Sequence, residues 1–306
     1  MSKKAFLVGI NNFTRPDWQL NGCLNDTVAV RELLQSYFEF QDDDIKVIHD
    51  RDATTQGIRD GLGWLLQNAR SGDVRIFHFS SHGTQVPDES DDEMDVQDEV
   101  IVPFDHDWSK PFRDDDLRAI FDTIPDGVNF TFIADCCHSG SIQKGLLDSG
   151  IEFKPRYLTP PPDIIDRIRE LEQKRKDAAD AAAAAELMQM LQDVPREEQA
   201  AKMAEYIAQL RKKLAENKFA VIPEAKHFLL AACEDRQTAA DAHIEGDYHG
   251  AFTWALYRGV KEAQGSLTYD DVIARISANL SDYDQIPQLE CPTGVRTLKL
   301  FAPLVP

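Results

Sequence analysis

The sequence predicts an α/β fold with a mostly parallel central sheet and helices on both of its faces. Short apolar runs typical of buried strands alternate with stretches whose apolar residues recur at helical spacing. The chain has 306 residues, of which 42% are hydrophobic and 9% aromatic, so it can bury a large core. Two of the apolar runs end abruptly in polar and reactive side chains, and ligands bind at such strand ends in open α/β sheets. The sequence therefore predicts a reactive site at one edge of the sheet.

The predicted strands and helices alternate along the chain. The strands are short apolar runs that stop at polar or small residues, and they cover residues 5–10, 45–48, 74–79, 100–103, 129–134, 227–232 and 297–301. The helices begin near residues 26, 54, 117, 250 and 268, the last after a T-x-x-D sequence that resembles a capping box. Residues 163–217 are rich in alanine and charged side chains. They predict two long helices, broken at Pro195 and inserted between core strands.

Charge and cysteine content restrict the partners and the compartment. The chain has 33 basic and 53 acidic residues, and its net charge of −20 argues against nonspecific binding to nucleic acid or to an anionic membrane. It has neither a signal-peptide core nor a run of about 18 apolar residues. Five cysteines in a long chain do not predict a disulfide framework. We expect a cytoplasmic protein with no membrane and no nucleic-acid partner.

Two predicted strand ends carry reactive side chains. The strand at 74–79 runs into His82 within S-S-H-G, and the strand at 129–134 runs into Cys137 within D-C-C-H-S-G. Neighbouring parallel strands end at the same edge of a sheet, so a nucleophilic thiol and its base could face each other there. The alternatives are a structural histidine and a structural or metal-binding cysteine pair. The metal alternative lacks a second C-x-x-C or an H-x-x-x-H motif.

Two acidic clusters flank the short strand predicted at 100–103. Residues 88–99 include eight Asp and Glu side chains, and residues 114–116 are three consecutive aspartates. Such a density of like charges predicts a hard cation with oxygen ligands, which makes calcium a candidate. The loop lacks the glycine of an EF-hand. The alternative for the second cluster is that its aspartates cap a helix and interact with the helix dipole.

Seven motifs together resemble the metacaspases, which are caspase-like cysteine peptidases. The motifs are G-C-L-N-D at 22–26, S-S-H-G-T-Q at 80–85, D-E-V-I-V-P at 98–103, D-D-D-L at 114–117, D-C-C-H-S-G-S at 135–141, G-A-F-T at 250–253 and Q-x-P-Q-L at 285–289. The resemblance, to a bacterial-type member with a helical insertion, spans nearly the whole chain apart from that insertion and implies a caspase-like fold. It assigns residues 1–150 to a large-subunit-like region, 151–225 to the insertion or linker, and 226–306 to a small-subunit-like region.

The resemblance also implies a catalytic dyad of His82 and Cys137. The backbone amides of Gly83 and Cys137 would then donate to the oxyanion, and an acyl-enzyme would form on Cys137. Cys136 would pack structurally beneath the site.

The specificity pocket implied by the resemblance consists of Cys23, Asp26, Ser80 and Asp135. Its two carboxylates repel each other unless a cation lies between them, which agrees with the cleavage after Arg or Lys typical of the family. Calcium, as an activator and not a catalytic metal, would bind Asp98, Asp114 and Asp115.

These inferences predict a monomeric cysteine endopeptidase that cleaves after Arg or Lys, is stimulated by calcium and can process itself. Its partners would be peptide or protein substrates. The first alternative is a caspase-fold regulatory or scaffold module whose helical insertion binds a partner. The second is a peptidase with asparaginyl preference, which the two pocket carboxylates disfavour because neutral Asn would leave both uncompensated.

Overall fold

The computed structural model describes residues 1–88, 97–137, 153–192, 194–217, 227–234, 237–283 and 285–304, with the backbone alone for 210–217. The chain forms two compact units. The first comprises Met1–Val86, Asp98–Pro160 and Ala225–Pro306, and the second comprises Pro87–Gln97 and Pro161–Glu224.

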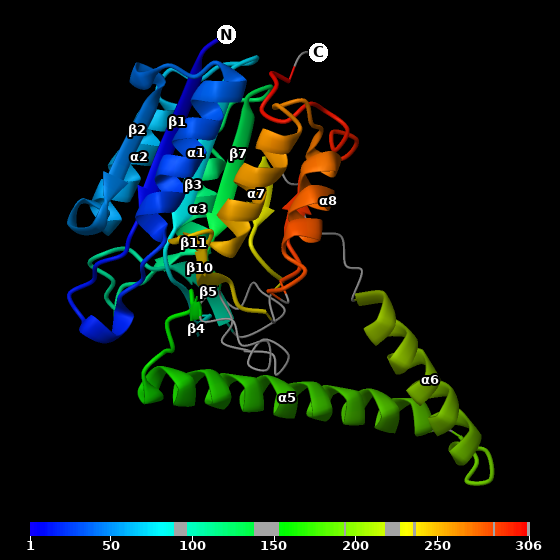
Figure 1. Ribbon diagram of the computed structural model, residues 1–306. Coiled ribbons are helices and arrows are strands. Elements are labelled where there is room, and N and C mark those ends of the chain that lie inside the picture. The colour runs from blue at the N-terminus through cyan, green and yellow to red at the C-terminus, as the bar shows by residue number, and fades with distance from the viewer. Residues whose placement is uncertain are drawn as a thin grey trace. The chain divides into compact units, whose positions relative to one another are not determined.

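A six-stranded sheet is the centre of the first unit (Figure 1). Its strand order is β12-β9-β7-β3-β1-β2, and every neighbouring pair is parallel except β12 with β9. The bounds are β1 (Lys3–Gly9), β2 (Ile45–His49), β3 (Val74–Ser80), β7 (Asn129–Asp135), β9 (Phe228–Ala231) and β12 (Gln288–Glu290). This sheet, covered by helices, confirms the predicted α/β fold class.

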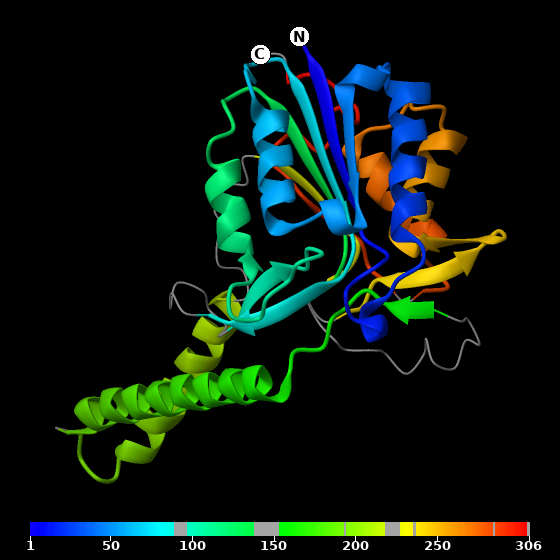
Figure 2. The same cartoon turned by 90° about the vertical axis from the view of Figure 1, so that its left-hand side faces the viewer.

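Both faces of the sheet are buried, which explains why its strands are continuous apolar runs. On β1, Ala5 and Leu7 belong to one hydrophobic cluster and Phe6 and Val8 to the other, because successive side chains alternate between faces. The first cluster packs under α1 (Cys23–Phe38), α7 (Ala251–Glu262) and α8 (Tyr269–Asn279). The second packs under α2 (Thr55–Leu66) and α3 (Asp114–Phe121), on the other side of the sheet in Figure 2.

Two small sheets lie beyond the carboxyl ends of the parallel strands (Figure 2). One has the order β11-β10-β8 and consists of β8 (Phe153–Pro155), β10 (Ala240–Ile244) and β11 (Asp247–Gly250). The other consists of β4 (Gly83–Pro87), β5 (Gln97–Ile101) and β6 (Phe112–Arg113). β10 pairs antiparallel with both β11 and β8, and β5 pairs antiparallel with β6. Both sheets extend the edge at which the strand ends meet (Figure 2).

One predicted strand is wrong. Residues 297–301 form turns and a single bridge between Thr268 and Lys299, and β12 is the edge strand of the sheet instead. The apolar side chains Leu300 and Phe301 are buried against the first hydrophobic cluster, so their hydrophobicity reflects core packing and not strand pairing.

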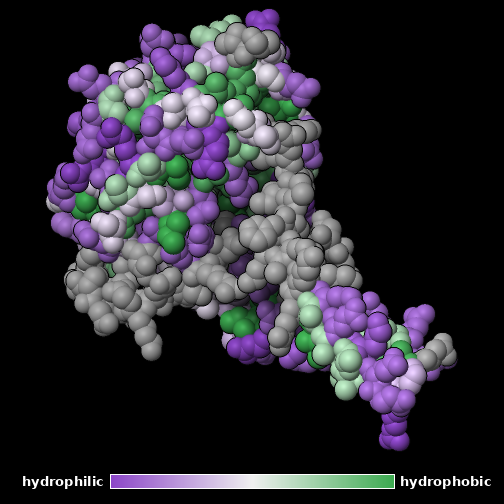
Figure 3. Space-filling model, turned by 90° about the vertical axis from the view of Figure 1, so that its right-hand side faces the viewer, coloured by the Kyte–Doolittle hydropathy of each residue, from purple (hydrophilic) through white to green (hydrophobic). Residues whose placement is uncertain are grey.

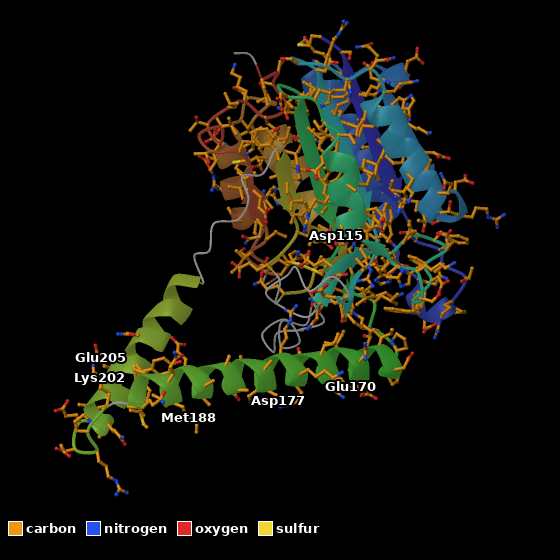
Figure 4. All side chains as sticks on the ribbon, turned by 180° about the vertical axis from the view of Figure 1, so that it is seen from behind. Asp115, Glu170, Asp177, Met188, Lys202 and Glu205 are labelled. Carbon is orange, nitrogen blue, oxygen red and sulfur yellow. A yellow bond between two sulfur atoms is a disulfide. The ribbon has the colours of Figure 1, made fainter. Side chains whose placement is uncertain are left out.

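The second unit contains α5 (Pro162–Leu191) and α6 (Gln199–Asn217), the two helices predicted within 163–217. Tyr206 of α6 donates a hydrogen bond to the carbonyl of Ala183 on α5 at 3.2 Å. Figure 4 shows Glu170, Asp177 and Met188 along one side of α5, and Figure 3 shows hydrophilic side chains over much of the visible face of this unit. No helix in the described residues is both long and apolar enough to cross a membrane.

Candidate functional site

The ends of β3 and β7 lie side by side. Ser80 pairs in register with Asp135, the last residues of two adjacent parallel strands. His82 and Cys137 each follow two residues beyond this pair, at the edge where the sequence predicted them to meet. Both residues are buried, with exposed fractions of 5% for His82 and 0% for Cys137.

The backbone around these two residues converges on one carbonyl group, that of Arg156. The amide of Gly83 donates to the Arg156 carbonyl oxygen at 3.0 Å, and the amide of Cys137 donates to the same oxygen at 3.2 Å. These are the two amides expected as oxyanion donors. The arrangement polarises the carbonyl of the Arg156–Tyr157 peptide bond and could stabilise negative charge on its oxygen.

The segment that carries this bond crosses the site in an extended conformation. Before the bond, β8 pairs antiparallel with β10, and the amide of Arg156 donates to the carbonyl of Ala239 at 2.9 Å. After the bond, Tyr157 forms a parallel bridge with Gly83, and the amide of Leu158 donates to the carbonyl of Gly83 at 2.9 Å. Edge-strand pairing on both sides of one peptide bond is how peptidases and other proteins hold extended peptides.

The side chain of Arg156 is fully buried in an acidic pocket. Its Nη2 lies 2.7 Å from Asp26 Oδ2 and 3.0 Å from Asp241 Oδ1. Its Nη1 lies 3.1 Å from Asp135 Oδ1 and donates to Ser80 Oγ at 2.8 Å. The structure therefore brings together three of the four predicted pocket residues around a guanidinium.

Burial and charge act in opposite directions in this pocket. Burial disfavours ionisation of Asp26, but Arg156, the nearby ring of His249 and a hydrogen bond from Ser80 outweigh it and lower the pKa of this carboxyl. For Asp135, burial prevails over Arg156 and raises the pKa. Burial also opposes the charge on Arg156, yet Asp135 and its neighbours hold the pKa of the guanidinium well above its usual value. A cation in the pocket is thus what allows the carboxylates to ionise there.

Two small residues and one thiol complete the pocket wall. A Cβ atom on Gly250 would collide with Asp135 Oδ2 and with Nη1 of Arg156, so only glycine leaves room for the guanidinium. A Cβ on Gly22 would lie 2.7 Å from Asp241 Oδ1. Cys23, the fourth predicted pocket residue, is fully buried, and burial raises the pKa of its thiol well above the usual value. It is therefore a neutral wall residue.

Cys137 is bonded to Cys233 through a disulfide, a pairing that the cysteine content did not predict. The two Cα atoms are 6.7 Å apart, and Cys233 follows β9, the strand next to β7. A sulfur in this bond is not a thiolate, so this form of the site has no free nucleophile. The neighbouring Cys136 packs in the cluster on the opposite face of the sheet from Cys137.

His82 is held in a single orientation. Its Nε2 lies 2.9 Å from the carbonyl oxygen of Trp18, which can only accept, so Nε2 carries the proton. Its Nδ1 has no hydrogen-bond partner among the described residues. Burial lowers the pKa of His82 to about 4, so the ring is neutral at neutral pH and Nδ1 offers a lone pair to a proton donor.

We expect the free energy of unfolding to fall as the pH decreases from 6.5 toward 4. Burial lowers the pKa values of His78 and His82 from 6.5 to about 4, so the unfolded chain binds protons in this window that the folded chain does not. Each histidine contributes a loss of about 3 kcal/mol at most. Denaturant unfolding at several pH values should show a shallower decline for His78→Gln, whereas His243→Gln, at an exposed position, should follow the parent. An unchanged slope for His78→Gln would contradict this expectation.

In the described part of the chain, the three residues predicted to bind calcium lie beside arginine side chains. Asp98 is buried and pairs with Arg113, while Asp114 and Asp115 lie 3.3 and 3.2 Å from Arg118. Among the described residues, no group of three or more His, Cys, Asp or Glu side chains could hold a metal. Asp114, Asp115 and Asp116 occupy the first turn of α3, where carboxylates interact favourably with the helix dipole. Five further acidic residues of the first cluster, within 89–96, lie outside the described residues.

Three residues of the site were not identified from the sequence, namely Arg156, Asp241 and Cys233. Asp241 follows a predicted strand at 227–232, in the polar stretch Q-T-A-A-D, so the signal that identified His82 was also present there. Arg156 falls in the region 151–225 assigned to the insertion, but the structure places it in the first unit. Its position depends on the pairing of β8 with β10, which no local pattern indicates.

A sequence profile of the caspase domain matches residues 2–298 of the chain. The chain belongs to the caspase-domain family. Curated relatives of this caspase-domain chain are metacaspases, as the seven motifs indicated. Metacaspase-1 of Schizosaccharomyces pombe is 29% identical over 303 residues, which cover 94% of this chain and 67% of the relative. Metacaspase-1 of Coccidioides immitis is 31% identical over 307 residues, covering 98% of this chain and 63% of the relative.

The caspase-domain chain thus spans about two thirds of the length of these relatives. Metacaspase-7 of Arabidopsis thaliana is 37% identical over 183 residues, covering 58% of this chain and 43% of the relative. A crystal structure of a protein from Geobacter sulfurreducens superposes with a TM-score of 0.61, at 21% identity and with full coverage of both chains. That likeness shows the fold. The profile match and the metacaspase relatives together confirm the resemblance to metacaspases.

Proposed function

We propose that this caspase-domain protein is a cysteine endopeptidase that cleaves after Arg or Lys and that cleaves its own Arg156–Tyr157 bond. The observation that carries the proposal is the position of Arg156. Its side chain lies among three carboxylates while its carbonyl oxygen accepts from the amides of Gly83 and Cys137. A substrate with Arg before the scissile bond needs both of these contacts at once.

In the proposed mechanism, the thiol of Cys137 in its reduced form loses its proton to Nδ1 of His82. The sulfur attacks the carbonyl carbon of the residue in the acidic pocket, and the amides of Gly83 and Cys137 stabilise the negative oxygen that forms. His82 then returns the proton to the departing amine. Water hydrolyses the acyl-enzyme and restores the thiol. The Trp18 carbonyl keeps the imidazole in the required tautomer throughout.

The occupied pocket also supports an inhibited precursor. As long as residues 153–158 pair with β10 and Gly83, a second peptide cannot enter. Self-cleavage would separate residues 153–156 from residues 157–158, so that each part could leave the site. Calcium stimulation, with Asp98, Asp114 and Asp115 as the ligands, is part of the proposal, but no step of the mechanism depends on it.

The test is an assay of fluorogenic peptides that end in Arg, Lys, Asn or Asp, performed under reducing conditions with and without calcium. We expect hydrolysis of the Arg and Lys peptides and none of the Asp peptide. In parallel, intact-mass analysis should detect fragments of residues 1–156 and 157–306. If the reduced protein hydrolyses no Arg peptide, and still hydrolyses none after removal of Arg156, the proposal is wrong.

Gly250→Ala is expected to lower kcat/KM for Arg peptides by at least about 100-fold, because the added methyl group occupies the space of the guanidinium. Gly246→Ala is not a matched control, because Gly246 has a positive φ. Gly63→Ala, on α2, is suitable since a Cβ there meets nothing within 4 Å. Peptide kinetics and a melting curve for each variant would check the prediction. Equal kinetics for Gly250→Ala and the parent would count against the pocket.

The alternative function, a scaffold whose α5 and α6 bind a partner, would leave the contacts of Arg156 without a role. It would be favoured if a Cys137→Ala protein retained the cellular phenotype while a protein lacking residues 163–217 lost it.

A further inference from the structure

The guanidinium of Arg156 uses its two terminal nitrogens for different sides of the pocket. Nη1 contacts Ser80 and Asp135, while Nη2 contacts Asp26 Oδ2 at 2.7 Å and Asp241 Oδ1 at 3.0 Å. A lysine ammonium is a single nitrogen and cannot occupy both positions. The acceptors are therefore arranged for a planar guanidinium, which has two terminal nitrogens.

Asp241 is fixed in place independently of Arg156. It is buried on β10, its Oδ2 accepts from the amide of Asn21 at 2.8 Å, and its Oδ1 accepts from the amide of Gly22 at 2.8 Å. These two amides belong to the turn that precedes α1, the helix that supplies Asp26. The carboxylate therefore presents one oxygen to Nη2 without further ordering of its side chain.

We propose that Asp241 is a specificity-determining residue that makes the pocket prefer arginine over lysine. The inference rests on the proposed peptidase function and refines it. Asp26 and Asp135 supply negative charge that either basic side chain can use. Asp241 adds a charge-assisted acceptor at the second terminal nitrogen, which only arginine possesses.

The experiment compares kcat/KM for matched peptides ending in Arg and in Lys, under reducing conditions. We expect the parent to prefer Arg, and Asp241→Asn to lower the Arg-to-Lys ratio about tenfold. Asp126→Asn, at an exposed position, is the charge-matched control and should keep the parent ratio. The ratio is the measured quantity because a general loss of structure would lower both rates together and would not change it. An Arg-to-Lys ratio in Asp241→Asn equal to that of the parent overturns the inference. Hydrolysis of neither peptide by the parent would instead overturn the proposed function.

A second, independent observation is the bond between Cys137 and Cys233. Cys137 is fully buried, whereas Cys233 is half-buried and is therefore the more accessible of the two sulfurs. A sulfur in a disulfide cannot act as the nucleophile, so the bond blocks Cys137. The Arg156 carbonyl nevertheless accepts hydrogen bonds from the amides of Gly83 and Cys137. Substrate placement and nucleophile availability are thus separable in this site.

We infer that Cys233 is a redox partner that reversibly blocks Cys137. With a small disulfide such as oxidised glutathione as oxidant, the Cys233 thiolate attacks one of its sulfurs and releases one glutathione thiolate. The Cys137 thiolate then attacks the Cys233 sulfur and releases the second. Two electrons pass from the protein sulfurs to glutathione, and two protons are released. A reducing dithiol reverses both steps and restores activity.

The test treats the full chain with oxidised glutathione and then with dithiothreitol. We expect the parent to lose two hydrogen masses and its Arg-peptidase activity, and to regain both on reduction. Non-reducing peptide mapping should identify the Cys137–Cys233 link. Cys233→Ser should form no such link and keep its Arg-peptidase activity under the same oxidation, and Cys291→Ser should behave as the parent. If the parent is active but forms no Cys137–Cys233 link, this inference is wrong and the proposed function stands. If the reduced parent has no activity, the proposed peptidase function is wrong.

Discussion

Cys137→Ala is expected to reduce hydrolysis of Arg peptides by at least about 10³-fold and to stop cleavage at Arg156–Tyr157, since the variant has no nucleophile. The amides of Gly83 and Cys137 and the acidic pocket remain, so substrate binding should persist. Peptide kinetics and intact mass after incubation under reducing conditions provide the measurement.

The matched control is Cys136→Ala, the adjacent cysteine. Because Cys136 packs on the opposite face of the sheet, its replacement should leave kcat close to that of the parent. If Cys137→Ala hydrolyses Arg peptides as fast as Cys136→Ala, then Cys137 is not the nucleophile.

Arg156→Gln is expected to abolish self-cleavage at the Arg156–Tyr157 bond and to empty the acidic pocket. The variant loses the cation that compensates Asp26, Asp135 and Asp241, so its free energy of unfolding should fall by about 3 kcal/mol. Intact mass should show the 306-residue chain uncut at this position, while the parent yields residues 1–156 and 157–306.

Two controls keep this prediction falsifiable. Lys154→Gln, an exposed change two residues before Arg156, should be cleaved as the parent. Agmatine, a small guanidinium compound, should raise the melting temperature of Arg156→Gln more than that of the uncut parent, because only the variant has a vacant pocket. Cleavage of Arg156→Gln at the same bond, or no stabilisation by agmatine, would contradict the role given to Arg156.

The sequence was sufficient for the parts of the fold and site that depend on local pattern. Buried parallel strands are continuous apolar runs, and the polar residues that end β3 and β7 identified His82, Cys137 and Asp135. The strand predicted at 297–301 was wrong, because buried apolar residues give the same sequence pattern in turns as in strands.

The parts that could not be predicted depend on contacts between distant segments. Asp241 joins the pocket because β10 packs beside the turn at Asn21 and Gly22, about 220 residues earlier in the chain. Arg156 directly follows β8, a short edge strand whose register is determined by β10. Cys233 meets Cys137 because β9 is the parallel neighbour of β7, and the order of strands in a sheet is not a local property.

The position of the Arg156–Tyr157 bond has a kinetic consequence. The bond already lies at the amides of Gly83 and Cys137 within the same chain, so its cleavage requires no encounter between molecules. The fraction of cleaved chains should therefore rise with a first-order rate constant that is the same in dilute and concentrated samples. The time from reduction of Cys137 to cleavage of the bond would therefore be a property of the single molecule and would not depend on the protein concentration.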